Sequence, residues 1–178
     1  GGPELWIKRD DLTGLAAGGN KTRKLEFLVA DALAQGADTL ITVGAPQSNH
    51  CRLTLAAAAK EGLKCRLVLE QRVPGSYDPN ASGNNFLYTL IGAETIKVVT
   101  AGDDLDAAMQ GIAGELEAQG RKGYVIPGGA SNPLGALGYV VCAHEIAAQS
   151  FDHGVSFDRI VVSSGSCGTH SGLLAGAR

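Results

Sequence analysis

The sequence predicts an α/β fold built on parallel sheets with helices on both faces. Short hydrophobic segments typical of strands alternate with longer segments of helical periodicity along the 178 residues. Several of the short segments are continuous apolar runs, which is typical of parallel strands buried on both faces. In such sheets ligands bind beyond the carboxyl ends of the strands, so we expect functional residues in the turns that follow them.

The first half of the chain is predicted from apolar periodicity and from capping and turn residues. Residues 4–9 alternate like a strand and lead into a loop rich in glycine and alanine. Asn20 is expected to cap a helix over residues 21–35, which Gly36 ends. The same signals then predict a strand at 39–43, a helix at 51–60, a strand at 65–69 and a short helix at 85–91.

The second half of the chain repeats this alternation. A strand at residues 95–99 precedes a helix that Asp103 or Asp104 caps and that ends at residues 119–120. The remaining elements are a strand at 124–126, a glycine-rich loop at 128–133, a helix at 134–150, a strand at 159–162 and a helix beginning near 171. Residues 36–127 are expected to form a compact unit, with both flanking segments in a second one.

Composition and charge narrow the class of protein. The chain is 44% hydrophobic and 19% charged, which is typical of a globular cytoplasmic protein, and its net charge of −3 gives no basic surface for nucleic acid. No apolar run is long enough to span a bilayer, so we expect no membrane partner. The four cysteines lack C-x-x-C spacing and are expected to be free thiols, and no metal site is expected.

The stretch from Gly18 to Glu26 places two lysines at the start of a helix. Lys21 falls on the first turn, and Lys24 lies on the same helix face. The positive end of a helix dipole disfavours cations, so two lysines with Arg23 indicate a bound anion or an uncharged lysine. A lysine close to other cations loses its proton more easily and becomes a nucleophile for carbonyl groups. A solvated basic turn is the simpler alternative.

The turn from Ser163 to His170 follows a hydrophobic run and opens a helix. Its small residues let backbone N–H groups reach an anion at the helix N-terminus, which favours a phosphate site. A tight turn with hydroxyl caps is the alternative, and the spacing does not match a dinucleotide motif. Residues 14–22 nearly match the phosphate loop of NTPases, but Asn20 stands where that motif requires lysine.

The turn Gln47-Ser48-Asn49-His50 joins a strand to a helix. Its amides and the Ser48 and Asn49 side chains can hold a carboxylate, although a polar helix cap is an equally good interpretation. A nucleophilic lysine, a phosphate site and a carboxylate site together favour pyridoxal 5'-phosphate with an amino-acid substrate.

Five motifs, in order, resemble those of the ACC deaminase/D-cysteine desulfhydrase family. They are Ile7-Lys8-Arg9-Asp10-Asp11, the run from Gly18 to Leu28, Gln47-Ser48-Asn49, Ile126-Pro127-Gly128-Gly129 and Gly135-Ala136-Leu137-Gly138-Tyr139. The resemblance covers essentially the whole chain and is strongest to D-cysteine desulfhydrases and L-cysteate sulfo-lyases. It implies the fold-type II, tryptophan-synthase-β-like architecture of two domains, usually as a homodimer. Residues 1–35 and 128–178 would form part of the large cofactor-binding domain, and residues 36–127 the small α/β domain.

The resemblance also implies roles for individual residues. Lys21 matches the lysine that bonds covalently to pyridoxal phosphate, and Lys24 matches a lysine that contacts its phosphate. Asn49 matches the asparagine that hydrogen-bonds the phenolic oxygen of the cofactor. Ser48, Asn49 and His50 match residues that contact the substrate, and Ser48 also matches a proposed proton carrier. His50 departs from ACC deaminases, which carry glutamine there. The phosphate loop matches Gly165, Ser166, Cys167, Gly168 and Thr169.

The implied reaction is a β-elimination from a small amino acid. Sulfide would leave D-cysteine, or sulfite would leave L-cysteate, to give pyruvate and ammonia. The alternatives are ring opening of 1-aminocyclopropane-1-carboxylate and, in another class, a cofactor-binding domain without activity. The C-terminal portion that supplies the partner of the pyridine nitrogen is expected to lie outside these 178 residues, so the implied activity is that of a longer parent.

Overall fold

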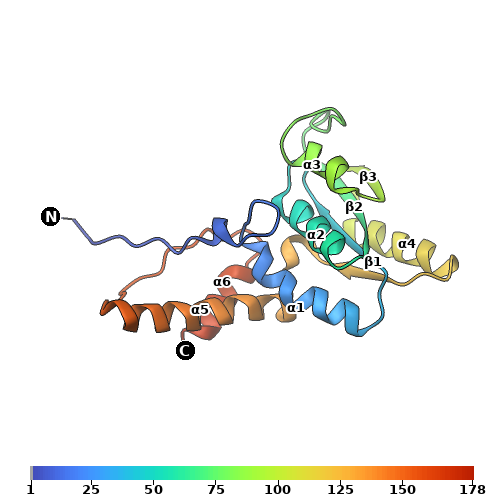
Figure 1. Ribbon diagram of the computed structural model, residues 1–178. Coiled ribbons are helices and arrows are strands. Elements are labelled where there is room, and N and C mark those ends of the chain that lie inside the picture. The colour runs from blue at the N-terminus through green and yellow to red at the C-terminus, as the bar shows by residue number, and fades with distance from the viewer. Residues whose placement is uncertain (1) are drawn as a thin grey trace.

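A four-stranded parallel sheet forms the centre of the computed structural model, which describes residues 2–178 (Figure 1). Its strands are β1 (Thr39–Gly44), β2 (Lys64–Gln71), β3 (Thr95–Thr100) and β4 (Gly123–Ile126), in the order β3-β2-β1-β4. β1 pairs with both β2 and β4, so that Thr42 lies opposite Leu67 and Ile126. The predicted parallel α/β class is confirmed.

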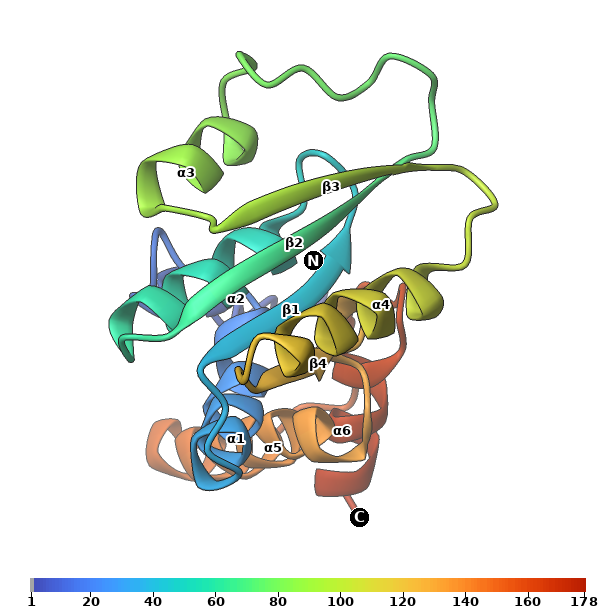
Figure 2. The same ribbon diagram turned by 90° about the vertical axis from the view of Figure 1, so that its right-hand side faces the viewer.

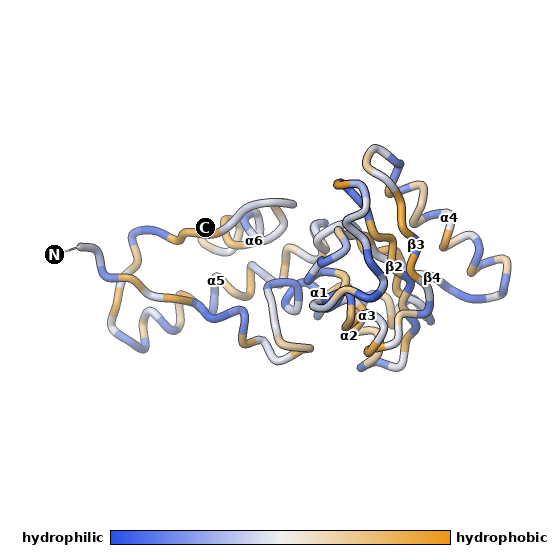
Figure 3. Tube along the Cα trace, turned by 90° about the horizontal axis from the view of Figure 1, so that it is seen from above, coloured by the Kyte–Doolittle hydropathy of each residue, from blue (hydrophilic) through white to orange (hydrophobic). Residues whose placement is uncertain are grey.

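Helices cover both faces of this sheet (Figure 2). On one face, α1 (Lys21–Ala34), α2 (Asn49–Lys60) and α3 (Asn84–Ile91) share a core with the sheet residues Leu40 and Leu67. On the other face, α4 (Leu105–Ala118) packs on Ile41 and Val68. Hydrophobic residues concentrate along the strands (Figure 3). Successive side chains of a strand point to opposite faces of the sheet, so neighbouring residues such as Leu40 and Ile41 belong to different cores.

Two further helices lie away from the sheet, one packed against α1 and the other packed against the first. They are α5 (Pro133–His153) and α6 (Gly168–Gly176), and a short 3-10 helix, η2 (Gly128–Ala130), connects β4 to α5. A Cβ added at Gly138 would collide with the backbone of Arg23, and one at Gly172 with the backbone of Ala136. The glycines of the predicted motif at residues 135–139 therefore allow α5 to approach α1 closely.

The predicted strands at residues 4–9 and 159–162 are wrong. Both segments are extended, and the first ends in a 3-10 helix, η1 (Asp10–Leu12). Their side chains are largely exposed, with Ile7 at 80% and Val161 at 95%. A strand needs a partner for its backbone groups, and neither segment is paired within residues 2–178.

The other predicted elements are present with ends that differ by a few residues. The largest differences are that α5 extends to His153 and that α6 begins at Gly168 rather than near residue 171. Asp104, one of the two candidates, caps α4 by accepting a hydrogen bond from the Ala107 amide. The division into two domains remains a prediction. No helix within residues 2–178 is both long and apolar enough to cross a bilayer.

Candidate active site

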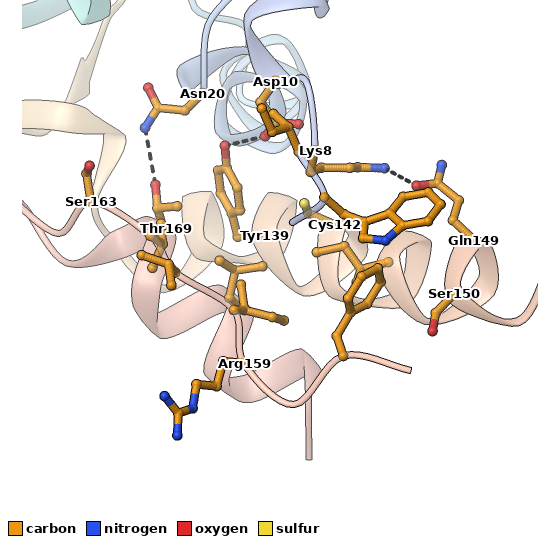
Figure 4. A pocket seen from close by; sticks show the side chains of 18 of the residues that line it. Lys8, Asp10, Asn20, Tyr139, Cys142, Gln149, Ser150, Arg159, Ser163 and Thr169 are labelled. Carbon is orange, nitrogen blue, oxygen red and sulfur yellow. Dashed lines mark hydrogen bonds between the residues drawn. The ribbon is translucent and has the colours of Figure 1, made fainter. Parts of the chain in front are cut away.

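The three predicted functional turns meet at the carboxyl edge of the sheet. Asn49 Nδ2 donates a hydrogen bond to Asn20 Oδ1 at 3.4 Å, and Asn20 Nδ2 donates to Thr169 Oγ1 at 3.3 Å. Figure 4 shows the second of these bonds. The N-terminal ends of α1, α2 and α6, which lie far apart in the sequence, are thereby joined side by side.

Asn20 does not cap α1 as expected. Its backbone already has helical angles, with φ −59° and ψ −17°, and its side chain makes no capping bond. A capping side chain requires a more extended backbone, so this amide is free to bridge Asn49 and Thr169 instead.

Lys24 is a fully buried ammonium group without a counter-anion. Its exposed fraction is 0%, and Nζ donates to Gly129 O at 3.2 Å and to Ser131 Oγ at 3.3 Å. No carboxylate within residues 2–178 forms an ion pair with it. Burial, followed by repulsion from Lys21, lowers the pKa of Lys24 to about 8. Such a site stabilises an incoming anion, because the buried cation has lost its water and has only neutral oxygens as partners within residues 2–178.

The loop before α6 lies beside this ammonium group. Ser131 Oγ and Ser166 Oγ are 2.6 Å apart, and a Cβ added at Gly168 would lie 2.7 Å from Lys24 Nζ. Gly168 is therefore required for the close approach of the α6 N-terminus to the lysine. The two hydroxyl groups, the helix N-terminus and the ammonium group form an arrangement that suits a phosphate group.

Ser131 was missed by sequence reasoning. It follows the motif Ile126-Pro127-Gly128-Gly129, and only its hydroxyl contact with Lys24 reveals its place in the site. A serine in a polar loop carries no such signal in the sequence. In the phosphate loop itself, Gly165, Ser166 and Cys167 are exposed, whereas Gly168 and Thr169 are buried.

Lys21 is half-buried, and burial lowers its pKa. The expected influence of Arg23 on this pKa is wrong. Arg23 Nε donates to Asp10 at 2.9 Å, and its Nη1 donates to Glu145 at 2.8 Å. The guanidinium is thus neutralised by two carboxylates, while α1 presents Lys24 to the phosphate loop.

The Arg23 network fixes the start of α1 and explains two of the sequence motifs. Tyr139 donates to Asp10 at 2.6 Å (Figure 4), and Lys8 donates to Glu145 at 2.7 Å. Hydrogen bonds from Arg23 hold the pKa of Glu145 at about 2. The motifs at residues 7–11 and 135–139 therefore orient the lysine helix, because they carry Lys8, Asp10 and Tyr139.

The turn at residues 47–50 is held from the α3 side. Ser48 Oγ accepts a bond from the Cys51 amide at 3.3 Å and caps α2, while Tyr88 donates to the Ser48 carbonyl at 2.8 Å. Gln47 Oε1 accepts a bond from the Asn84 amide at 2.8 Å. Gln47 therefore anchors the turn to α3. Ser48 accepts its capping bond and keeps its own hydroxyl hydrogen for another partner.

His50 is the least accessible of the residues assigned to substrate, with 3% of its surface exposed. Its Nε2 lies 2.8 Å from Thr42 Oγ1, and its Nδ1 has no partner within residues 2–178. Burial, followed by the charges of Lys21 and Lys24, lowers its pKa to about 3. The ring is therefore neutral at physiological pH.

A cavity of about 820 Å³ opens beside the phosphate loop (Figure 4). Its lining includes the polar residues Asn20, Ser163 and Thr169 and the aromatic residues Trp6 and Phe157. Both extended segments that were predicted to be strands border this cavity. Among residues 2–178, no group of three or more histidine, cysteine, aspartate or glutamate side chains is placed to hold a metal ion.

A lysine buried without a counter-anion among residues 2–178, a second lysine of lowered pKa and a phosphate-type loop together fit a pyridoxal-phosphate protein. The chain belongs to the pyridoxal-phosphate dependent enzyme family, whose model matches residues 1–178. The parallel fold and the family assignment agree with the predicted fold-type II architecture.

Known relatives are similar over nearly the whole chain. D-cysteine desulfhydrase of Serratia proteamaculans is 53% identical over 176 residues, which are 98% of this chain and 53% of that protein. D-cysteine desulfhydrase of Yersinia enterocolitica shows the same identity and the same shares. A solved ACC deaminase homologue has a TM-score of 0.82 and 47% identity, over 95% of this chain and 50% of that one. The chain thus spans about half the length of the curated relatives it matches.

Proposed function

We propose that this chain holds pyridoxal phosphate with its phosphate group between Lys24 and the N-terminus of α6. The observation that carries the proposal is the ammonium of Lys24, which is fully buried, lacks a counter-anion and would lie 2.7 Å from a Cβ at Gly168. Ser131 and Ser166 add hydroxyl donors, and Thr169 adds a third. Lys21, on the same helix and also of lowered pKa, is the group that bonds covalently to the cofactor.

We further propose that the full-length protein is a lyase that removes a β-substituent from a small amino acid, with D-cysteine as substrate. The relatives named D-cysteine desulfhydrase, at 53% identity, support this choice. When bound, the cofactor withdraws electrons from the substrate α-carbon, so that a proton and then the β-substituent can leave. Overall, D-cysteine and water would give pyruvate, ammonia and hydrogen sulfide.

The residues of this chain would divide the remaining work. Lys21, once free, accepts the α-proton, because its lowered pKa leaves more of the neutral amine available as a base. The Ser48 hydroxyl donates to the substrate carboxylate, since its oxygen already accepts from Cys51 and its hydrogen is available. Asn49, exposed at the same helix end, donates to the phenolic oxygen of the cofactor.

A second candidate is the opening of 1-aminocyclopropane-1-carboxylate, supported by the 47% identity to the ACC deaminase homologue. L-cysteate, which would release sulfite, is a third substrate that the family resemblance suggests. A cofactor-binding protein without activity is the remaining alternative. The resemblance also supports a homodimer for the full-length protein.

The experiment is a direct comparison of three substrates with the purified full-length protein. D-cysteine, L-cysteate and the cyclopropane amino acid are each supplied at equal concentration. Sulfide, sulfite, ammonia and the 2-oxo acid are then measured. We expect sulfide and pyruvate from D-cysteine at the highest kcat/KM. Preference for either other substrate would replace this assignment, and the absence of all products from cofactor-loaded protein would support the inactive alternative.

A further inference from the structure

His50 carries a polar atom that nothing in the rest of the proposed site explains. Its ring is buried at the carboxyl edge of β1 and β4, where Thr42 and Ile126 are opposite residues of the parallel pair. Nδ1 is buried and has no hydrogen-bond partner within residues 2–178. An unpaired buried acceptor is costly, and native proteins rarely leave one without a reason.

The hydrogen bonds of Thr42 identify the form of the ring. Thr42 Oγ1 lies 2.9 Å from the Ile126 carbonyl and 2.8 Å from His50 Nε2. A carbonyl oxygen only accepts, so the single hydroxyl hydrogen of Thr42 is directed to Ile126. Nε2 must then donate to Thr42, which leaves the lone pair of Nδ1 unprotonated and without a partner within residues 2–178. The backbone of Pro127 also acts on the ring, but proline has no N–H and cannot donate to Nδ1.

The charged groups that act on this ring are the two lysines of α1. Lys24 already donates to Gly129 and Ser131. Lys21 is half-buried, burial lowers its pKa, and its amine makes no hydrogen bond within residues 2–178. Asn20, which precedes Lys21, accepts a hydrogen bond from Asn49, which precedes His50, at 3.4 Å. An ammonium group without an acceptor and an acceptor without a donor, among residues 2–178, therefore lie at the same junction of α1 and α2.

We propose that His50 is a positioning residue for Lys21, whose ammonium group donates a hydrogen bond to His50 Nδ1 whenever Lys21 is not bonded to the cofactor. The inference rests on the proposed function, since it assigns the resting place of the amine that the reaction releases. Thr42 keeps the ring in the required tautomer, and burial keeps the ring neutral, so Nδ1 stays an acceptor. The released amine is then held near the site instead of turning into solvent.

A purely structural role predicts a different partner for Nδ1. Thr54, one helical turn after His50 on α2, has a buried hydroxyl that likewise finds no partner in the described part of the chain. A buried water could link these two polar groups without involving Lys21. The variants Lys21→Met and Thr54→Val separate the two explanations, and Lys60→Met, at the exposed end of α2, is the matched lysine control.

The test is nuclear magnetic resonance of the cofactor-free full-length protein with ¹⁵N-labelled histidine. The exposed residues His144, His153 and His170 serve as internal references. We expect His50 in the Nε2–H form. In Lys21→Met we expect its Nδ1 resonance to shift and its pKa to rise by about one unit, a tenfold change in protonation. Thr54→Val and Lys60→Met should leave both unchanged.

Two results would overturn the inference. One is an Nδ1–H tautomer, and the other is a response to Thr54→Val without a response to Lys21→Met. Failure of the proposed function has a separate signature, because borohydride would then not fix the cofactor on Lys21. A variant that has lost its fold is recognised by the narrow dispersion of its remaining resonances. In that case Lys21→Arg serves as a second variant, because it keeps the positive charge but places it on a side chain of different length and shape.

Discussion

Lys24 Nζ lies 3.3 Å from Ser131 Oγ, and this hydroxyl lies 2.6 Å from that of Ser166. The contacts connect the lysine helix, the loop after β4 and the loop before α6. No carboxylate within residues 2–178 neutralises the ammonium group. The arrangement therefore has a positive charge without a counter-charge among these residues, and a bound anion would supply one.

Replacing Lys24 by methionine should weaken cofactor binding and stabilise the cofactor-free protein. The variant removes a charge-assisted contact worth about 1.5–3 kcal/mol, so Kd should rise at least tenfold. It also removes the cost of burying an unpaired ammonium group, so the midpoint of thermal unfolding should rise without cofactor. Titration calorimetry and thermal unfolding measure the two effects. Lys60→Met is the control, and equal affinities for the two variants would place the phosphate elsewhere.

Cofactor affinity should decrease as the pH rises above about 8, the pKa of Lys24 in the cofactor-free protein. A phosphate group favours the charged lysine, so binding above this pH must be accompanied by proton uptake. Calorimetry in buffers of different ionisation enthalpy measures that uptake. Because the pKa of Lys24 is lower in the folded protein than in the unfolded chain, the folded state binds fewer protons above pH 8. The contribution of Lys24 to the free energy of unfolding should therefore increase between pH 8 and 10.5, the pKa of an unperturbed lysine.

Borohydride should fix the cofactor on Lys21 of the full-length protein. The reason is that Lys21 is half-buried, has a lowered pKa and, unlike Lys24, makes no hydrogen bond through its amine within residues 2–178. Peptide mass spectrometry after reduction identifies the modified residue. Labelling of Lys24 or Lys8 in its place would show that the covalent role is misassigned.

Two glycines of the phosphate loop should respond differently to alanine. At Gly168 a Cβ would lie 2.6 Å from Ser131 Oγ and 2.7 Å from Lys24 Nζ, whereas at Gly165 nothing lies within 4 Å. Gly168→Ala should displace the ammonium group and raise the Kd for pyridoxal phosphate at least tenfold. This corresponds to a loss of about 1.4 kcal/mol or more of binding free energy. Gly165→Ala should change it by less than about threefold. Equal effects of the two substitutions would contradict this arrangement.

Removing the Ser48 hydroxyl should lower kcat by about 100-fold if Ser48 carries protons as well as binding substrate. Ser48→Gly is preferred to alanine, because glycine is tolerated as a helix cap at a cost of a few tenths of a kcal/mol. Steady-state kinetics on D-cysteine measure the effect, with Ser76→Gly on an exposed loop as control. A rise in KM alone would restrict Ser48 to binding, and unchanged kinetics would remove it from the site.

The sequence identified the three turns that the structure brings together, because each follows a predicted strand or precedes a predicted helix, and these signals are local. The sequence-based predictions were wrong or incomplete where a structure or contact depends on residues that are far apart in the sequence. Residues 4–9 and 159–162 have strand-like patterns, but no strand pairs with them within residues 2–178. Arg23 lies beside Lys21 in the sequence, yet its side chain is bound by Asp10 and Glu145. The role of Ser131 likewise depends on a contact that spans 107 positions.

The separation between Arg23 and Glu145 also has a consequence for the order of folding. Their hydrogen bond spans 122 positions, whereas the strands of the sheet all lie between Thr39 and Ile126. Closing a longer loop costs more chain entropy, and a nascent chain cannot make a contact with a residue that has not yet been synthesised. The sheet can therefore form, with α1 packed on it through Leu25 and Leu28, before Glu145 is available. The contacts of Arg23 with Glu145 are made only when α5 emerges, so the start of the lysine helix is fixed after its scaffold.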